Sequence, residues 1–435
     1  MYQSDSQSDT FVYYEKGEND MKVAILGAGV SGLSAGRMLK DKGHDVTVYE
    51  KNGTIGGLAR TRFTEGYLYD PHGGHIFNSK HKEIVDWVFS ILPKENWQYT
   101  VRNAKIFFNG KYVSYPFELS LCELDTEDAV NCVYDFILSK EGPEPDNFRD
   151  WIVWNFGKSI SDYYMIPYNE KIWSYPLEDM ETKFMQGKMP LPTKKEMIHS
   201  MLLKDPSERK MPHSTFYYPL KGGIQTMVDA IAKGLHIKCG YNIETVKRKN
   251  DNWFINGEGP FDIVISTIPL PELPERMELP DTINEHIKDL KYNSLTTVLF
   301  NCPKTDITWL YIPSHDFRSH RVGYQSALTP NACPTNNEGC GALEIIGKQF
   351  EITPEFAEEK NILPKELGFE RVIDSEFTKY AYVIHDKNYR KNTDAIKEYF
   401  ESMPGFELLG RWGTWNYKNM DLCMLDAKEL VERIG

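Results

Sequence analysis

Two short apolar runs separated by a helical pattern open the globular part of the chain. Residues 23–26 (VAIL) form the first run and residues 46–49 (VTVY) the second, and the residues after Gly32 follow a helical pattern. Buried parallel strands appear as short continuous apolar runs, and a helix between two of them is the usual crossover. The pattern therefore predicts a strand, a helix and a second strand of one parallel sheet.

The turn between the first strand and the helix is rich in glycine. Gly27 permits a tight turn, Gly29 lets the backbone approach a pyrophosphate, and Gly32 allows the helix to pack closely on the strand. The free N–H groups at the start of the helix would face the phosphates. Glu50 ends the second strand, where a carboxylate accepts hydrogen bonds from a ribose diol. The stretch 22–50 predicts a dinucleotide-binding unit.

The periodicity changes twice further along the chain. From residue 81 to about residue 201, apolar residues at helical spacing and punctuating prolines predict a mostly helical insertion. Between residues 292 and 387, alternating runs such as 296–300 (TTVLF) and 342–346 (ALEII) predict an antiparallel sheet.

Length and charge limit the classes of partner. A chain of 435 residues is too long for one core, so two or three domains are expected. A net charge of −13 argues against nucleic acid, although local cations can still bind an anionic small ligand. No apolar stretch reaches membrane-spanning length, and residues 1–20 lack the features of a signal peptide, so we expect a cytoplasmic protein that is not embedded in a membrane. The seven cysteines contain no CxxC pair, which favours reduced thiols and no metal.

A second glycine pair follows in residues 51–61 (KNGTIGGLART), where Gly56 and Gly57 would let another backbone segment approach the same dinucleotide. This extended pattern resembles the FAD-binding families that include amine oxidases, protoporphyrinogen oxidases and UDP-galactopyranose mutases. The resemblance implies FAD as the cofactor. An ordinary glycine-rich loop is the alternative.

A histidine follows a third glycine pair in residues 73–77 (GGHIF). A glycine pair lets backbone lie against a flat ring, and the imidazole of His75 can hydrogen-bond to that ring. The stretch resembles the histidine loop beside the flavin in UDP-galactopyranose mutases, although Asn78 stands where a second histidine often follows. A buried structural histidine is the alternative.

Residues 168–173 (YNEKIW) combine stacking faces, a phenol and a cation, which suit a nucleotide-diphosphate sugar. They resemble the Tyr-x-x-Lys-x-Trp pattern of the mutases, in which the aromatic pair lines the sugar and uridine pocket. An aromatic core is the alternative.

The C-terminal stretch 406–421 (FELLGRWGTWNYKNMD) resembles the Gly-Arg…Tyr…Met-Asp element of the mutases. The resemblance gives Arg411 the pyrimidine edge of the flavin and gives Tyr417 and Tyr382 the substrate phosphates. A helix that begins after Asn419 would offer N–H groups to the flavin. An ordinary capped helix is the alternative.

Two arginines of the mutase pattern are absent. Pro192, in residues 188–192 (KMPLP), and Asn293, in residues 292–295 (YNSL), stand where mutases have arginines that contact substrate phosphates. Arg318 or Arg321 could compensate if the chain turns either of them inward; surface arginines are the alternative.

Motifs and resemblance together give a set of candidate site residues. The catalytic candidates are His75, Arg411, Tyr382 and Tyr417, and the substrate-binding candidates are Tyr168, Lys171, Trp173, Tyr218 and Asn293. The cofactor-binding candidates are Gly27, Gly29, Val30, Ser31, Gly32, Glu50, Lys51, Gly57, Leu58, Gly73, Gly74, His75, Ile76, Val246, Gly410, Arg411, Asn419, Met420 and Asp421.

The resemblance covers residues 22–421 and implies a flavin-dependent nucleotide-sugar mutase of cell-surface polysaccharide biosynthesis. In such enzymes N5 of reduced FAD is the nucleophile at the anomeric carbon, and NAD(P)H is the expected reductant. The runner-up is an FAD-dependent oxidoreductase of the amine oxidase or protoporphyrinogen oxidase type, and the third alternative is a scaffold that retains FAD without catalysis. The expected partner is a nucleotide-diphosphate sugar, and the sequence is compatible with a homo-oligomer.

The expected fold class is α/β, with domains built from discontinuous segments. Residues 21–80, 215–285 and 388–435 would form a Rossmann-like FAD-binding domain, residues 81–214 the helical insertion, residues 286–387 an antiparallel substrate domain, and residues 1–20 a disordered extension.

Overall fold

The computed structural model describes residues 20–185, 189–203, 214–352, 356 and 361–435. The predicted disordered extension therefore lies, apart from Asp20, outside the described residues, as does Lys188 of the stretch 188–192.

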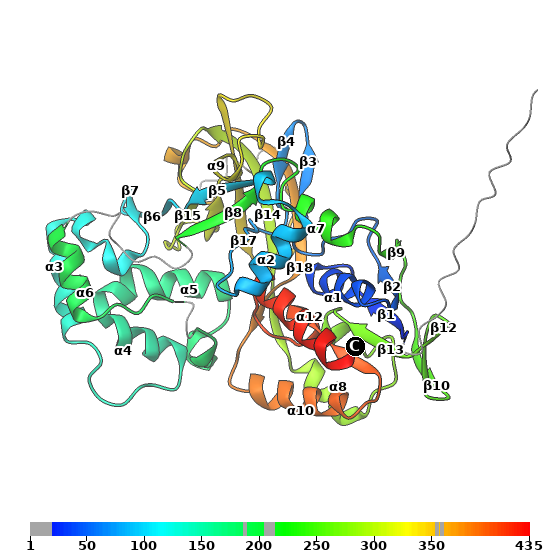
Figure 1. Cartoon of the computed structure of the whole chain (residues 1–435). Helices are drawn as coiled ribbons and strands as arrows, with labels where there is room; N and C mark the ends of the chain where they lie inside the picture. The colour runs from blue at the N-terminus through cyan, green and yellow to red at the C-terminus, as the bar shows by residue number, and fades with distance from the viewer. Residues whose placement is uncertain (1–19, 186–188, 204–213, 353–355, 357–360) are drawn as a thin grey trace, which may run out of the picture.

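A five-stranded parallel sheet carries the N-terminal motif. Strand β1 (Lys22–Leu26), helix α1 (Val30–Asp41) and strand β2 (Asp45–Glu50) confirm the predicted strand–helix–strand unit. The sheet order is β19-β13-β1-β2-β9, completed by β9 (His236–Cys239), β13 (Ile263–Ser266) and β19 (Phe406–Leu408). Three distant chain segments thus form one α/β layer, in which α1 lies beside α12 (Met420–Ile434) (Figure 1).

A seven-stranded sheet forms the second layer. Its order is β18 (Val372–Ile384), β14 (Lys291–Pro303), β17 (Glu338–Ile346), β16 (Arg321–Gly323), β15 (Trp309–Tyr311), β6 (Ala104–Phe108) and β7 (Lys111–Ser114). The pairings among β14 to β18 are all antiparallel, as predicted, and a parallel pairing arises where β6, from outside that segment, joins β15. The segment predicted to be helical supplies β6 and β7, and their pairing satisfies backbone groups that the edge of β15 would otherwise leave open.

The insertion contains the predicted helices together with strands that the helical pattern missed. The helices are α2 (Lys82–Ile91), α3 (Thr126–Ile137), α4 (Phe148–Ile160), α5 (Ile166–Trp173) and α6 (Lys194–Leu203). Strand β5 (Trp97–Val101) pairs with β8 (Thr215–Pro219). Helices α3 to α6 lie to the left in Figure 1, away from α1 and α12.

One glycine decides how closely two of these helices approach. Gly157 has φ +73°, and a Cβ at this position would lie 2.5 Å from the carbonyl oxygen of Asp135 in α3. Only a residue without a side chain lets α3 and α4 pack this way.

The remaining elements connect these layers. They are β3 (Arg62–Thr64), β4 (Tyr67–Tyr69), α7 (Gln225–Ala232), β10 (Val246–Lys249), β11 (Asn252–Ile255), β12 (Glu258–Phe261), α8 (Asp281–Lys288), α9 (Gln325–Leu328), α10 (Tyr389–Glu401) and α11 (Gly410–Gly413).

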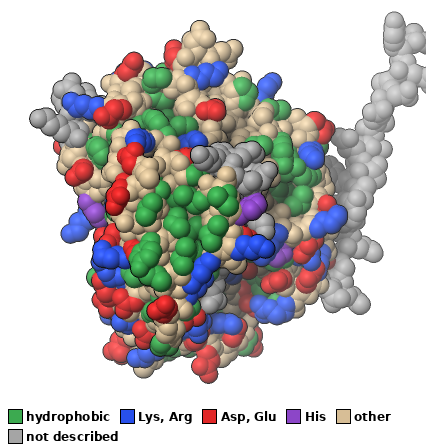
Figure 2. Space-filling model, turned by 90° about the vertical axis from the view of Figure 1, so that its left-hand side faces the viewer, with side chains coloured by type: hydrophobic (Ala, Val, Ile, Leu, Met, Phe, Trp, Pro, Cys, Tyr) green, Lys and Arg blue, Asp and Glu red, His purple; other side chains and the backbone are tan. Residues whose placement is uncertain are grey.

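Apolar side chains gather on the outer face of the insertion, which faces the viewer in Figure 2. Exposed members of this group are Val130, Tyr134 and Ile137 of α3, Val153 of α4, and Ile198 and Leu202 of α6. Within the described part of the chain, no helix combines the length and the hydrophobicity that a bilayer span needs. The expectation of a homo-oligomer stays a prediction.

Candidate functional site

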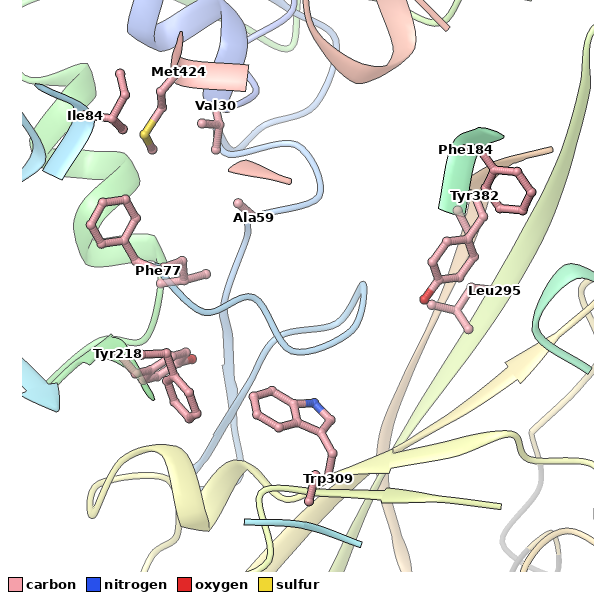
Figure 3. Packing of buried hydrophobic residues seen from close by; sticks show 14 of the residues in the cluster. Val30, Ala59, Phe77, Ile84, Phe184, Tyr218, Leu295, Trp309, Tyr382 and Met424 are labelled. Atoms are coloured by element: carbon pink, nitrogen blue, oxygen red, sulfur yellow. The ribbon is translucent and has the colours of Figure 1, made fainter. Parts of the chain in front are cut away.

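A cavity of about 770 Å³ lies where the two sheets and the insertion meet. Figure 3 shows Val30 and Ala59 from the dinucleotide-binding layer, Trp309 from β15, and Leu295 and Tyr382 from the long strands, and all five line this cavity. The volume falls in the range of small-molecule sites.

The two glycine turns lie side by side at one end of the cavity. The amide of Gly56 donates to the carbonyl of Ala28 at 2.8 Å, and a Cβ at Gly57 would lie 3.1 Å from Cα of Gly29. Gly27 adopts φ +102°, as a tight glycine turn requires. These turns form a cradle in which backbone can lie against a ligand.

Most neighbours of this cradle line the cavity as well. Val30, Ser31, Glu50, Lys51 and Leu58 are among the lining residues. Gly32 lies behind them. A Cβ at Gly32 would lie 2.1 Å from the carbonyl oxygen of Gly27, which matches the packing role predicted for this glycine.

Glu50 is buried at the end of β2, where its carboxylate organises the cradle. It accepts hydrogen bonds from the amide of Ala28 (2.9 Å) and from the amide and side chain of Asn52 (2.9 and 2.8 Å). Each carboxylate oxygen can accept two hydrogen bonds, so an acceptor site for a ribose hydroxyl remains. Lys51 pairs with Glu272 at the cavity rim (3.3 Å).

The histidine loop, residues 73–76, lines the next part of the cavity. Nδ1 of His75 donates to the carbonyl oxygen of Gly73 at 2.6 Å, and the amide of His75 donates to Asp70 at 3.1 Å. Burial lowers the pKa of His75 to about 4, and Arg411 and Arg321 act in the same direction. The imidazole is therefore neutral at pH 7, with a lone pair on Nε2.

Tyr218 supports this loop from behind and does not line the cavity. Its hydroxyl donates to the buried carboxylate of Asp70 at 2.9 Å and accepts from Gln325 at 2.5 Å. Burial raises the pKa of Asp70 to about 6. The structure therefore does not place Tyr218 on the substrate surface where the sequence predicted it.

The C-terminal motif brings a cation to the wall of the cavity. Arg411 lies 4.5 Å from the ring centroid of Tyr417 and 5.4 Å from that of Tyr382, and its Nη2 donates to the carbonyl of Ala381 at 2.5 Å. Its Nε is buried and has no hydrogen-bond partner among the described residues. This buried donor lines the cavity and is available to an acceptor atom of a ligand.

Asn419, Met420 and Asp421, at the start of α12, line the cavity beside Arg411. Gly410 does not. A Cβ there would lie 2.1 Å from Oγ of Ser31, so this glycine lets the arginine turn pack against α1.

Four aromatic candidates line the cavity, two of them in contact with Arg411. The Trp173 ring centroid is 6.1 Å from those of both Tyr382 and Tyr417, which are themselves 5.9 Å apart. Tyr168 lines the same cavity and stacks on Tyr164 at 5.5 Å. Residues from α5, from β18 and from the C-terminal segment thus converge.

Besides Gly32, Tyr218 and Gly410, three further candidates lie outside the cavity lining. Lys171 donates to the carbonyls of Ile312 (2.7 Å) and Ser314 (2.8 Å), and burial lowers its pKa to about 7. Asn293 is buried between α5 and β18. Val246 packs in β10, within a separate apolar cluster.

Asn293 connects the two aromatic elements of the site. Its side-chain amide donates to the carbonyls of Ile172 (2.8 Å) and Trp173 (3.0 Å), and its oxygen accepts from the amide of Tyr382 (3.2 Å). These bonds complete the end of α5, where helical carbonyls lack partners in the helix itself. Asn293 is therefore a positioning residue for Trp173 and Tyr382.

Of the two arginines suggested as replacements, Arg321 turns inward. It lines the cavity, pairs with buried Glu344 through Nε (3.0 Å) and Nη2 (2.7 Å), and contacts the hydroxyl of Tyr382 at 3.4 Å. Arg318 lies over the Phe350 ring at 4.5 Å and does not line the cavity. Pro192, which stands at the position of the other absent arginine, does not line the cavity either.

Sequence reasoning missed several residues of the cavity wall. Arg102 donates to the hydroxyl of Tyr311 and lies over the rings of Tyr115 (5.1 Å) and Trp309 (5.3 Å). Glu118 also lines the cavity. No motif surrounds these residues in the sequence; pairing of β6 with β15 brings their segment to the site.

Comparisons with known proteins agree with this architecture. A family model described as NAD(P)-binding Rossmann-like domain matches residues 25–89, and one described as flavin containing amine oxidoreductase matches residues 171–335. Protoporphyrinogen oxidase 2 of Arabidopsis thaliana is 21% identical over 462 residues, which cover 89% of this chain and 89% of the relative.

Similarity to UDP-galactopyranose mutases covers a smaller part of the chain in sequence than in structure. The enzyme of Mycoplasma pneumoniae is 25% identical over 173 residues, which cover 38% of this chain and 43% of that protein. The crystal structure of a reduced UDP-galactopyranose mutase matches with a TM-score of 0.84 at 22% identity and covers 95% of both chains. The fold of this chain is therefore similar to that of UDP-galactopyranose mutases, and its residues 171–335 match the family model of the flavin containing amine oxidoreductases.

Proposed function

We propose that this protein is a flavin-dependent mutase that interconverts the pyranose and furanose forms of a nucleotide-diphosphate sugar. The observation that carries the proposal is the convergence of Trp173, Tyr382 and Tyr417 beside Arg411, in the same cavity as the glycine cradle. Similarity to UDP-galactopyranose mutases supports it. The furanose would serve cell-surface polysaccharide synthesis.

The residues present fit FAD. The glycine cradle would hold the pyrophosphate, Glu50 the ribose, and the start of α12 together with Nε of Arg411 the isoalloxazine ring. When bound and reduced, the flavin supplies a nucleophilic nitrogen for the anomeric carbon. NAD(P)H is the proposed reductant.

Arg411 would place a fixed positive charge near the anionic part of a reduced ring, and neutral His75 would offer Nε2 as a hydrogen-bond acceptor. Burial raises the pKa of Tyr382, so its hydroxyl stays protonated and can donate to a leaving diphosphate. Arg321 contacts that hydroxyl and orients it. The aromatic wall would keep water from the opened sugar.

The proposal is tested with reduced, FAD-loaded protein under anaerobic conditions. UDP-galactose, UDP-N-acetylgalactosamine and dTDP-fucose are incubated separately, and products are resolved by chromatography and NMR. We expect a furanose from one of them and none with oxidised protein. Failure of all three with fully reduced, FAD-loaded protein would contradict the proposal for these sugars.

A second candidate is an oxidoreductase in which the substrate gives hydride to oxidised flavin. The similarity to protoporphyrinogen oxidase over 89% of the chain favours it, as do Pro192 and Asn293 at the positions of the absent arginines. Substrate-dependent bleaching of oxidised flavin with oxygen consumption would support this candidate over the mutase.

A further inference from the structure

A buried carboxyl group without a partner lies at the wall of the cavity. Glu118, in the short 3-10 helix Phe117–Leu119, is 1% exposed and lines the cavity. Among the described residues, neither of its carboxylate oxygens has a hydrogen-bond partner in another residue, and the only backbone contact is with the amide of Glu118 itself. Buried polar groups in native proteins are nearly always paired, so this carboxyl calls for a ligand or another explanation.

A series of side-chain contacts leads from Arg411 along the cavity wall to the residue before Glu118. Arg411 lies over the ring of Tyr382, and Arg321 contacts the hydroxyl of Tyr382 at 3.4 Å. Tyr168 interacts electrostatically with both Arg321 and Tyr382. Tyr168 stacks on Tyr164 at 5.5 Å. Tyr164 in turn stacks on Phe117, the residue before Glu118, at 5.3 Å.

This order matches the parts of a nucleotide sugar. With its sugar at the flavin near Arg411 and its diphosphate near Tyr382, such a substrate would extend its base toward Tyr168 and Tyr164. Aromatic faces of this kind stack on nucleobases. The carboxyl of Glu118 would then lie near the edge of the base.

The surroundings of Glu118 do not stabilise a negative charge. The phenols of Tyr115 and Tyr164 interact with it, and the cation over the Tyr115 ring is Arg102. Burial raises the pKa of Glu118 to about 8. The helices packed on its segment carry charges that are exposed or paired elsewhere: Arg149, Asp150 and Lys158 of α4, and Lys194, Lys195, Glu196 and His199 of α6.

We propose that Glu118 binds the base of the nucleotide sugar as a neutral carboxylic acid, donating its O–H to a ring carbonyl of uracil and accepting the N3–H. A neutral carboxyl has one donor and one acceptor side by side, which complement these two groups. A carboxylate would instead face a carbonyl oxygen with a negative charge. This inference rests on the proposed function, since it assumes a nucleotide sugar in the cavity.

The test measures binding of UDP to the FAD-loaded protein by calorimetry. In E118L both hydrogen bonds are lost, and we expect affinity to fall about tenfold or more. In E118Q the amide keeps one donor and one acceptor, so affinity near neutral pH should stay within about threefold of wild type. E127Q, at an exposed glutamate of α3, is the control and should bind as wild type does.

A pH series separates a direct contact from a packing effect. UDP affinity of wild type should fall as pH rises through about 8, because Glu118 ionises, whereas E118Q should lack this component. Titration of UDP itself occurs in both proteins and cancels in the comparison. If E118L fails to fold, the comparison of the pH profiles of wild type and E118Q still tests the proposed contact.

Three results would overturn the inference: no UDP binding by wild type, unchanged affinity in folded E118L, or identical pH profiles for wild type and E118Q. Failure of the mutase proposal has a different signature, in which UDP binds as described but no furanose forms.

Discussion

Substitution of Asn293 by aspartate tests whether this residue positions the aromatic wall. Asn293→Asp keeps the shape and the acceptor for the amide of Tyr382, but replaces the amide that donates to the carbonyls of Ile172 and Trp173. Two buried hydrogen bonds are lost, each worth about 0.5–1.5 kcal/mol, and carboxylate oxygens then face two carbonyl oxygens. We expect a loss of about 2–4 kcal/mol at neutral pH.

The loss should depend on pH in a defined direction. Burial beside two carbonyls raises the pKa of the new carboxyl above its unfolded value of about 3.9, so the folded protein retains the proton longer than the unfolded chain does. The deficit relative to wild type is therefore smallest below about pH 4 and grows as pH rises toward the folded pKa.

The measurement is the urea midpoint of wild type and variant at about pH 5 and about pH 7, together with UDP affinity and FAD content. Because Asn293 holds Trp173 and Tyr382 and does not line the cavity, UDP affinity should fall more than FAD content. Asn109→Asp, at an exposed position with φ +48° that Asp tolerates, is the control. Equal midpoints for wild type and Asn293→Asp at both pH values would refute the positioning role.

Three further predictions concern the cofactor side and the buried lysine. Gly57→Val should abolish FAD retention, because φ is +58° and the new side chain would begin 3.1 Å from Cα of Gly29. Gly53→Val is the control and should retain FAD, because a Cβ there has no neighbour within 4 Å. The flavin absorbance of the purified proteins measures both. Arg411→Met should lower the flavin reduction potential by about 30 mV or more, the equivalent of about 1.4 kcal/mol for two electrons, since a cation near the anionic reduced ring is removed; an unchanged redox titration would count against that contact. Burial lowers the pKa of Lys171 from 10.5 to about 7, so the folded state loses this proton at a lower pH than the unfolded chain does. Between pH 7 and pH 10.5, the free energy of unfolding of wild type should therefore rise relative to that of Lys171→Met. An equal dependence of stability on pH in both proteins across that interval would contradict this.

Local rules account for the parts of the fold that the sequence predicted. The unit from Gly27 to Glu50 formed as expected, because the turn, the helix start and the flanking strands are each specified by adjacent residues. The Arg411 turn lines the same cavity as the glycine turns. Strand β6 was missed because five residues with two aromatics are compatible with a strand or a helix until a partner strand is known.

The direction of the side chains on α5 and around β16 could not be derived from their spacing in the sequence. Lys171 shares a helix with Tyr168 and Trp173, yet its amine reaches the carbonyls after β15, because that loop lies against α5. Likewise, Arg321 faces the cavity and Arg318 does not, since β16 is held in register with β17 and its buried Glu344.

The sequence by itself determined the dinucleotide cradle, because glycines, apolar runs and a terminal carboxylate constrain the backbone within one continuous stretch. Only the tertiary structure decided which groups line the cavity. Arg102, Glu118 and Arg321 enter the cavity through pairing of β6, β15, β16 and β17, which joins segments about 200 residues apart. The charged residues of the cavity wall therefore come from segments that are distant in the sequence, and their positions depend on how those segments pack.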